Sequence, residues 1–351
     1  MKKVIAAIRK YPIALVSIGL FIVMLIAVPN FATTKNLANL FAQISYIGIS
    51  ATGIAYVFIG GGNDISTGAA ITMSGMLSGL VMMKIMQSEA ILASMGESGQ
   101  AGLATALGVI AVIIVGIVAS AVNGIFIAKL NVNSFMMTLI TQLIYKSVAL
   151  WPTKSKSIVA IPEAFIAIGK TKLFGVIPVS IFILFAFFIL GQLFLSKSGY
   201  GRKLFATGAN PRAARLVGIN TFSVLFKAYL FIGFCNAISA IILIGKLGVA
   251  NVAMGNDLFL DIMCAAIIGG CSLFGGKGSV TGTAFGVLLM GLITNGLTLL
   301  GVPYQGTTVV KGVVILGAIV LNTIQDRVAA KQMLASASQK HTAPEATKEA
   351  A

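Results

Sequence analysis

The sequence is poor in the side chains that enzymes most often use for acid–base and metal chemistry. Its 351 residues include nine acidic side chains, three cysteines and one histidine. His341 lies in a polar C-terminal segment, which excludes histidine-based catalysis within the apolar part of the chain. Cys235, Cys264 and Cys271 lie in or beside apolar segments without metal-ligand spacing, so we expect them to pack in a core. We therefore assign no catalytic residue and no metal ligand.

The sequence also has little charge of either sign. Charged residues make up 10% of the chain, against roughly 25% in soluble domains, and 58% of the residues are hydrophobic. The mean hydropathy of +0.99 predicts a polytopic, all-α membrane protein. Its 39 glycines and 14 methionines are typical of closely packed membrane helices. The net charge of +16 lies in segments between apolar runs, which indicates membrane orientation rather than nucleic-acid binding.

The apolar pattern predicts about ten transmembrane helices in a permease domain, 1–327, and a polar tail, 328–351. We expect the tail to be helical at first and then disordered. The predicted spans are 11–28, 37–59, 65–86, 103–128, 134–151, 176–195, 221–243, 258–274, 280–300 and 307–324. The first lacks a small-residue cleavage site, so we interpret it as a retained anchor. Eight or nine crossings are the alternative, because the eighth segment is short and interrupted by glycine.

The distribution of cations predicts that both termini are cytoplasmic. With ten spans in that orientation, 16 of the 25 Lys and Arg residues lie inside and 7 outside. Lys146 and Lys311, within spans, account for the remaining two. The lysine-rich segment 152–175 opposes this assignment mildly.

The longest basic, polar interval between apolar segments is 196–220, SKSGYGRKLFATGANPRAARLVGIN. Asn210 is a good N-cap, Pro211 suits the first helical position and Gly218 supplies a left-handed stop. Arg212 and Arg215 would be exposed on the resulting two-turn helix. One interpretation is an ordinary basic cytoplasmic loop, and the other is a helix that contacts a partner outside the membrane.

No segment supplies an energy source for transport. The nearest approach to a phosphate-binding loop, CSLFGGKGS, has Cys271 in place of the first glycine and Gly278 in place of Ser or Thr. Ion-coupled carriers bury charged residues along an ion path, and here Asp64 and Asp261 alone are well placed. The sequence therefore favours an external motor.

Two glycine-rich segments, GGGNDISTGAAITMSG (60–75) and FGGKGSVTGTAFGVLLMG (274–291), echo one another. Matching glycine-rich interruptions in two halves often mark transporter sites. Random similarity among glycine-rich membrane sequences is the other explanation.

Three segments resemble the permease subunits of bacterial ABC importers for simple sugars. They are 60–75, 199–220 and the block DIMCAAIIGGCSLFGGKGSVTGTAFGVLLMGLITNGLTLLGV (261–302). That family covers the ribose/galactose/xylose type and the autoinducer-2 importer. The motifs stand in family order over most of the chain. Three departures lie near the expected pathway. Phe259 replaces an acidic residue, Thr138-Leu139-Ile140 lies where Thr-Leu-Gly is frequent, and Lys146-Ser147 lies where Arg-Gly is frequent.

The resemblance implies a permease subunit in the bacterial cytoplasmic (inner) membrane that forms a solute pathway with a second permease. It implies a cytoplasmic ABC ATPase partner and a periplasmic or lipoprotein sugar-binding protein. No cofactor is expected on this chain, since ATP and Mg²⁺ belong to the ATPase. The expected coupling residues are Asn210, Pro211, Arg212, Ala213, Ala214, Arg215 and Gly218.

A hydroxyl-rich sugar calls for amide, hydroxyl and aromatic side chains along the pathway. The candidates are Asn63, Asp64, Ser66, Asn133, Phe135, Thr138 and Asn295, with Gln142 and Asn236 as further ones. For each of them, hydrogen bonding between helices is the alternative role. The functional alternatives are a stand-alone ion-coupled carrier of a small polar solute and a nucleoside-type ABC permease. The sequence does not name the sugar, the Gram type of the host, or whether the second permease is an identical chain.

Overall fold

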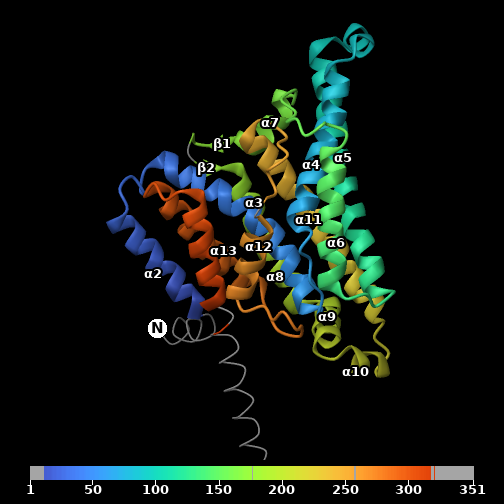
Figure 1. Cartoon of the computed structure of the whole chain (residues 1–351), viewed down its shortest axis with the longest axis vertical. Coiled ribbons are helices and arrows are strands. Elements are labelled where there is room, and N and C mark those ends of the chain that lie inside the picture. Colours follow the sequence, from blue (N-terminus) through green and yellow to red (C-terminus); the bar gives the residue numbers. More distant parts are fainter. Residues whose placement is uncertain (1–11, 176, 257, 318–319, 321–351) are drawn as a thin grey trace, which may run out of the picture.

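The computed structural model describes residues 12–175, 177–256, 258–317 and 320 (Figure 1). The apolar helices are α2 (Pro12–Ala27), α3 (Thr34–Ile59), α4 (Thr67–Met86), α5 (Glu89–Ala128), α6 (Ser134–Leu150), α8 (Val179–Lys197), α11 (Thr221–Leu247), α12 (Leu258–Ile268) and α13 (Val280–Leu299). Residues 304–317 are also helical. Shorter elements are α7 (Glu163–Lys170), α9 (Gly199–Ala209), α10 (Pro211–Leu216) and the strands β1 (Lys172–Leu173) and β2 (Ile177–Pro178).

The prediction of a polytopic all-α membrane protein is confirmed. Within the part of the chain that the structure describes, six helices are long and apolar enough to cross a membrane: α3, α4, α5, α8, α11 and α13. The shorter apolar helices α2, α6 and α12 and the helical segment 304–317 fall at the other four predicted spans. The two strands form only a small antiparallel hairpin, in which Lys172 pairs with Pro178.

The core of the bundle lies around α3 and α11, which pack against each other. Helix α3 is buried along nearly its whole length, and Tyr56 and Phe58 on it are fully buried, as is Tyr229 on α11. By contrast, α2, α5 and α8 expose many large apolar side chains. In a chain of this composition such surfaces face lipid, because the hydrocarbon interior satisfies apolar side chains while the helix satisfies its own backbone.

Close contact between α5 and α11 depends on glycine. A Cβ added at Gly116 would lie 2.9 Å from the carbonyl oxygen of Gly233, and one added at Gly233 would lie 2.7 Å from that of Gly116. Both distances are shorter than carbon and oxygen atoms tolerate, so the two backbones approach only because neither residue has a side chain.

Two of the differences from the predicted segmentation lie at 152–175 and at α12. The segment 152–175, expected to be a loop, contains α7, which packs on α11 where Gly169 meets Gly245. Helix α12 has 11 residues and so is about 16 Å long, about half the hydrocarbon thickness. The non-helical segment 269–279 continues the chain from α12 to the end of α3, where Gly276 N–H donates to Ile59 O at 2.9 Å.

Helices α9 and α10 lie at one end of the bundle, together with the start of α2 and the end of segment 304–317 (Figure 1). The opposite end carries α7, the β1–β2 hairpin and the long extension formed by the end of α4 and the start of α5. The predicted polar tail, 328–351, lies outside the described residues.

Candidate functional site

The predicted capped helix is present as α10. The Asn210 side chain accepts hydrogen bonds from the N–H groups of Arg212 and Ala213, at 3.0 and 3.1 Å. Pro211 occupies the first turn. Gly218 has φ +78°, and its N–H donates to Arg215 O at 3.0 Å. The helix is therefore closed at both ends by the residues that the sequence indicates.

The outer surface of α10 is both basic and apolar. The side chains of Arg212 and Arg215 are exposed, and Leu216 and Val217 at its end are 89% and 75% exposed. Only Ala214 faces inward. Sequence reasoning identified the basic residues but missed the apolar tip, although two large apolar residues directly before a helix-ending glycine were a visible signal.

Helix α9 was not predicted, and it connects α10 to the membrane bundle. It begins at a Ser198 N-cap, whose hydroxyl accepts from Gly201 N–H at 3.0 Å. At its other end Gly208 lies directly against the last turn of α3. A Cβ at Gly208 would lie 1.8 Å from Ile59 O and 2.7 Å from Gly276 N. The end of α9 thus contacts α3 and the α12–α13 connection through backbone atoms.

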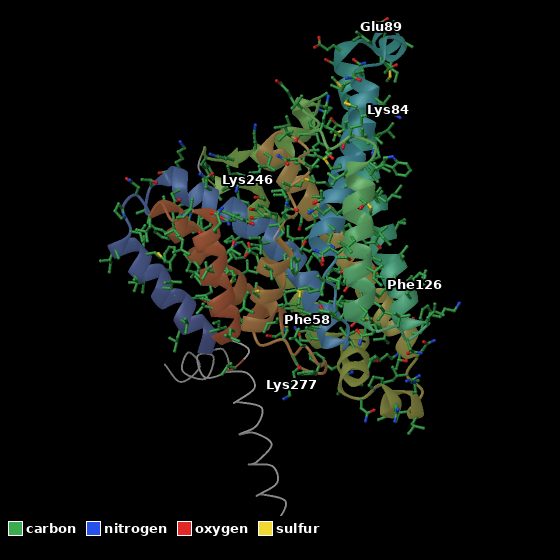
Figure 2. The ribbon with its side chains drawn as sticks, viewed as in Figure 1. Phe58, Lys84, Glu89, Phe126, Lys246 and Lys277 are labelled. Atoms are coloured by element: carbon green, nitrogen blue, oxygen red, sulfur yellow. The ribbon has the colours of Figure 1, made fainter. Side chains whose placement is uncertain are left out.

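The two glycine-rich segments that echo each other in sequence meet at this point. A Cβ at Gly275 would lie 2.8 Å from the Cα of Gly61 and 2.5 Å from Gly208 O. Gly61, Gly275 and Gly276 all have positive φ, between 74° and 90°. We call Gly61, Gly208, Gly275 and Gly276 the glycine junction. Figure 2 shows Lys277, the neighbour of Gly276, at the same end of the bundle as α9 and α10.

Predicted pathway residues at the α3–α4 turn form a buried hydrogen-bonded cluster. Asp64 is fully buried, and its Oδ1 accepts from both the backbone N–H and the hydroxyl of Ser66. The Ser66 hydroxyl in turn accepts from Asn123 Nδ2 on α5 at 2.8 Å. Thr138 Oγ1 accepts from Ile65 N–H at 3.1 Å. Burial raises the pKa of Asp64 to about 6, against the lowering effect of the Ser66 hydrogen bonds.

The other predicted pathway residues are dispersed. Asn295 on α13 pairs with Asn36 on α3 through two side-chain hydrogen bonds, at 3.0 and 2.9 Å. Asn133 caps α6, Phe135 is 54% exposed on that helix, and the Asn63 carbonyl accepts from Tyr229 at 2.7 Å. Asn236 is buried within α11. For Asn295 and Ser66 the contacts are those of the alternative role, hydrogen bonding between helices, and a pathway role stays a prediction.

A polar cavity of about 360 Å³ opens between α4, α6 and the segment before α12. Its walls are Gly68, Ala69, Thr72, Gln142, Lys146, Gly255, Asn256, Phe259 and Tyr304. Gln142 is the one pathway candidate among them. The sequence places Gln142 and Lys146 one turn apart, but Asn256 and Tyr304 come from distant segments, so the cavity was not predicted.

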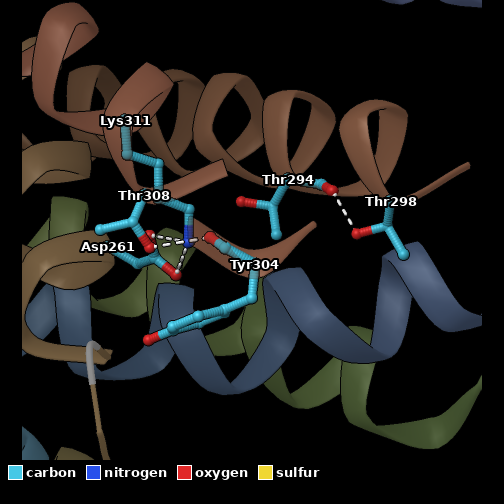
Figure 3. Close-up of polar contacts among 6 residues, drawn as sticks. All are labelled: Asp261, Thr294, Thr298, Tyr304, Thr308 and Lys311. Carbon is cyan, nitrogen blue, oxygen red and sulfur yellow. Dashed lines mark hydrogen bonds and ion pairs between the residues drawn. The ribbon is translucent and has the colours of Figure 1, made fainter. Parts of the chain in front are cut away.

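An ion pair adjoins this region. Lys311 Nζ lies 2.7 and 2.9 Å from the two carboxylate oxygens of Asp261 on α12 (Figure 3). The two side chains are only 12% and 7% exposed. The pair therefore joins the helical segment 304–317 to α12, and the two charges compensate each other.

Comparison with known proteins identifies the family. Residues 36–319 match the family described as the branched-chain amino acid transport system / permease component. The match covers most of the chain, and the chain belongs to this family. It is a multi-pass membrane protein of the permease class. Among solved structures, none gives a significant match.

Named relatives of the chain are permease proteins of sugar and autoinducer import. The ribose import permease protein RbsC of Bacillus subtilis is 33% identical over 311 residues, covering 87% of this chain and 91% of the relative. The L-arabinose transport system permease protein AraH of Escherichia coli is 30% identical over 320 residues, covering 91% and 92%. The autoinducer 2 import system permease protein LsrD of Enterobacter sp. is 30% identical over 273 residues, covering 76% and 78%.

Proposed function

We propose that this chain is the permease subunit of an ATP-binding-cassette importer for a simple sugar, of the ribose or arabinose kind. The named relatives support a sugar as solute. The chain is not an enzyme in this assignment: a partner ATPase hydrolyses ATP, and a second permease completes the pathway. A sugar-binding protein delivers the solute, so the pathway needs only weak contacts with it.

The observation that carries the proposal is the arrangement of α10 and the glycine junction. Helix α10 exposes two arginines and two large apolar side chains at the end of the bundle. Its neighbour α9 contacts the end of α3 and the connection before α13 directly through backbone atoms, with no side chain between them. A force on α10 therefore reaches both segments directly, as the transmission of a rigid-body movement requires.

The proposed orientation follows from the same end of the molecule. The cations of 196–220 lie with α9 and α10, and cytoplasmic segments carry an excess of Lys and Arg. The α10 end is then cytoplasmic, in the inner membrane, with both termini on that side. The α7 end faces the binding protein.

Reconstitution tests the proposal. We expect proteoliposomes that contain this chain, its ATPase and its binding protein to take up the sugar only with ATP in the ATPase compartment. Arg215→Glu in the full complex should abolish that uptake, while the conservative Arg215→Lys retains more of it.

The same experiment decides the competing assignment. Uptake by the chain alone, driven by an ion gradient and unaffected by ATP depletion, identifies a secondary carrier and overturns the proposal. A binding protein that prefers nucleosides over sugars keeps the importer assignment and replaces the solute.

A further inference from the structure

We propose that the polar cavity at Gln142, Lys146 and Tyr304 is an aqueous solute-contact site whose charge is set by Lys146, so that it favours neutral and anionic polyols and disfavours cationic ones. This inference rests on the proposed function for the identity of the solute. The accessibility and the charge of the cavity do not depend on the proposed function, and the experiment measures these two properties.

The walls of the cavity have the chemistry of a site for a hydroxyl-rich molecule. Gln142, Asn256 and Thr72 offer amide and hydroxyl groups that donate and accept hydrogen bonds, while Phe259 and Tyr304 supply aromatic surface. Gly68 and Gly255 contribute backbone without side chains to the lining. The volume of about 360 Å³ lies within the range of small-molecule sites.

Lys146 is the one charged residue among the described residues that line the cavity. The nearby charges of Asp261 and Lys311 are paired with each other, so they add little net charge. Asp257 follows Asn256 in sequence and lies outside the described residues. A cavity with one uncompensated cation repels cationic solutes and attracts anionic ones.

The position of the cavity suits the admission of solute from the outside. Lys146 is the thirteenth residue of α6 and so lies about 18 Å along the helix from Ser134. It lies four positions before Leu150, at the end of α6 away from α10. The same stripe of α6 continues toward the α10 end through Leu139 and Phe135, at helical spacing, and both side chains are exposed. The predicted pathway residue Phe135 thus follows the cavity along one helix face.

The test is cysteine accessibility in the full-length chain in membrane vesicles. Gln142→Cys and, on the opposite wall, Tyr304→Cys are treated in low-salt buffer with anionic methanethiosulfonate ethylsulfonate or cationic methanethiosulfonate ethyltrimethylammonium. The thiolate attacks the reagent sulfur, forms a mixed disulfide and releases methanesulfinate. The three natural cysteines are buried and give little background. Ile144→Cys, on the opposite face of α6 and 49% exposed, is the matched lipid-facing control.

We expect both cavity cysteines to react and Ile144→Cys to remain unmodified. For Gln142→Cys, one charge at the roughly 6 Å that separates i and i+4 side chains changes each rate about threefold in water, so the anionic reagent should react about tenfold faster. Tyr304→Cys should show a preference in the same direction. Lys146→Gln should remove most of this ratio, and Lys146→Glu should invert it.

Two results overturn the inference. If neither cavity cysteine reacts, the cavity is closed to water. If both react without preference for the anionic reagent, Lys146 is compensated, and recovery of the preference in Asp257→Asn would identify the compensating carboxylate. Because the readout needs no ATP, a failure of ATP-driven sugar uptake with the tenfold ratio intact counts against the proposed function alone.

Discussion

Replacing Gly208 with alanine is the most direct test of the glycine junction. The added Cβ would lie 1.8 Å from Ile59 O, whereas contacts of this kind are essentially never shorter than 3.0 Å. Helix α9 and the end of α3 must therefore separate by about 1.2 Å, the difference between these two distances. The hydrogen bond from Gly276 N–H to Ile59 O shares the displaced oxygen.

The expected cost follows from these contacts. Overpacking costs about 1–3 kcal/mol, and loss of one hydrogen bond about 0.5–1.5 kcal/mol. The better helix propensity of alanine offsets about 0.5–1 kcal/mol. We expect a net destabilisation of about 0.5–4 kcal/mol. At an unfolding entropy of about 2.1 cal/mol/K per residue, each kcal/mol should lower the melting temperature of a chain of 351 residues by roughly 1–2 °C.

The assay has two readouts on the purified importer: the melting temperature, and ATP hydrolysis stimulated by sugar-loaded binding protein. Gly208→Ala should lower both. Gly102→Ala is the matched control, since a Cβ at this helical glycine of α5 meets no atom within 4 Å. If Gly208→Ala matches the control in both readouts, the close backbone contact between α9 and the end of α3 is refuted.

Three further predictions concern α10 and two buried acids. Gly218 has φ +78°. Replacing it with valine, or replacing Arg215 with glutamate, should abolish transport-coupled ATP hydrolysis but leave membrane insertion intact. ATP hydrolysis coupled as in the wild type would contradict the coupling role. The folded-state pKa of Asp64, raised from 3.8 to about 6, means that its charged form is disfavoured in the fold, so stability is lost as pH rises from about 4 to above 6. Asp64→Asn should therefore stabilise the protein by up to about 3 kcal/mol at pH 7.5 and by little at pH 4. If the variant and the unsubstituted protein have the same melting temperature at pH 7.5 as well as at pH 4, this prediction is refuted. Lys311→Met should destabilise by about 3–5 kcal/mol because it removes the cation that compensates the buried Asp261 carboxylate. Adding Asp261→Asn should restore most of the melting temperature; an additive loss in the double variant would rule out the pairing.

Most of the helices could be predicted from sequence, because an apolar run and its boundary residues are local signals. The α10 caps belong to this class, since Asn210, Pro211 and Gly218 act on atoms within a few residues of themselves. Helices α7 and α9 were missed, because neither has an apolar run long enough to stand out from the polar segments around it.

The candidate site was predictable only in part. The coupling segment was found from its sequence, and the glycine-rich segments around Gly61 and Gly275 were noticed as an echo without a known relation in space. The pathway candidates were selected by residue type, as amide, hydroxyl, acidic and aromatic residues in or beside spans. Residue type did not distinguish Gln142, which lines a cavity, from Asn295, which is paired with Asn36.

By itself the sequence determined the class of protein, the positions of the spans and the capped helix, because low charge, apolar length and helix caps are properties of contiguous residues. Only the tertiary structure decided that Gly61, Gly208 and Gly275 meet, and that Lys146 shares a cavity with Tyr304. These relations join residues more than sixty positions apart. They depend on how the helices pack. A glycine permits close approach of another backbone, but the sequence does not specify which backbone it will contact.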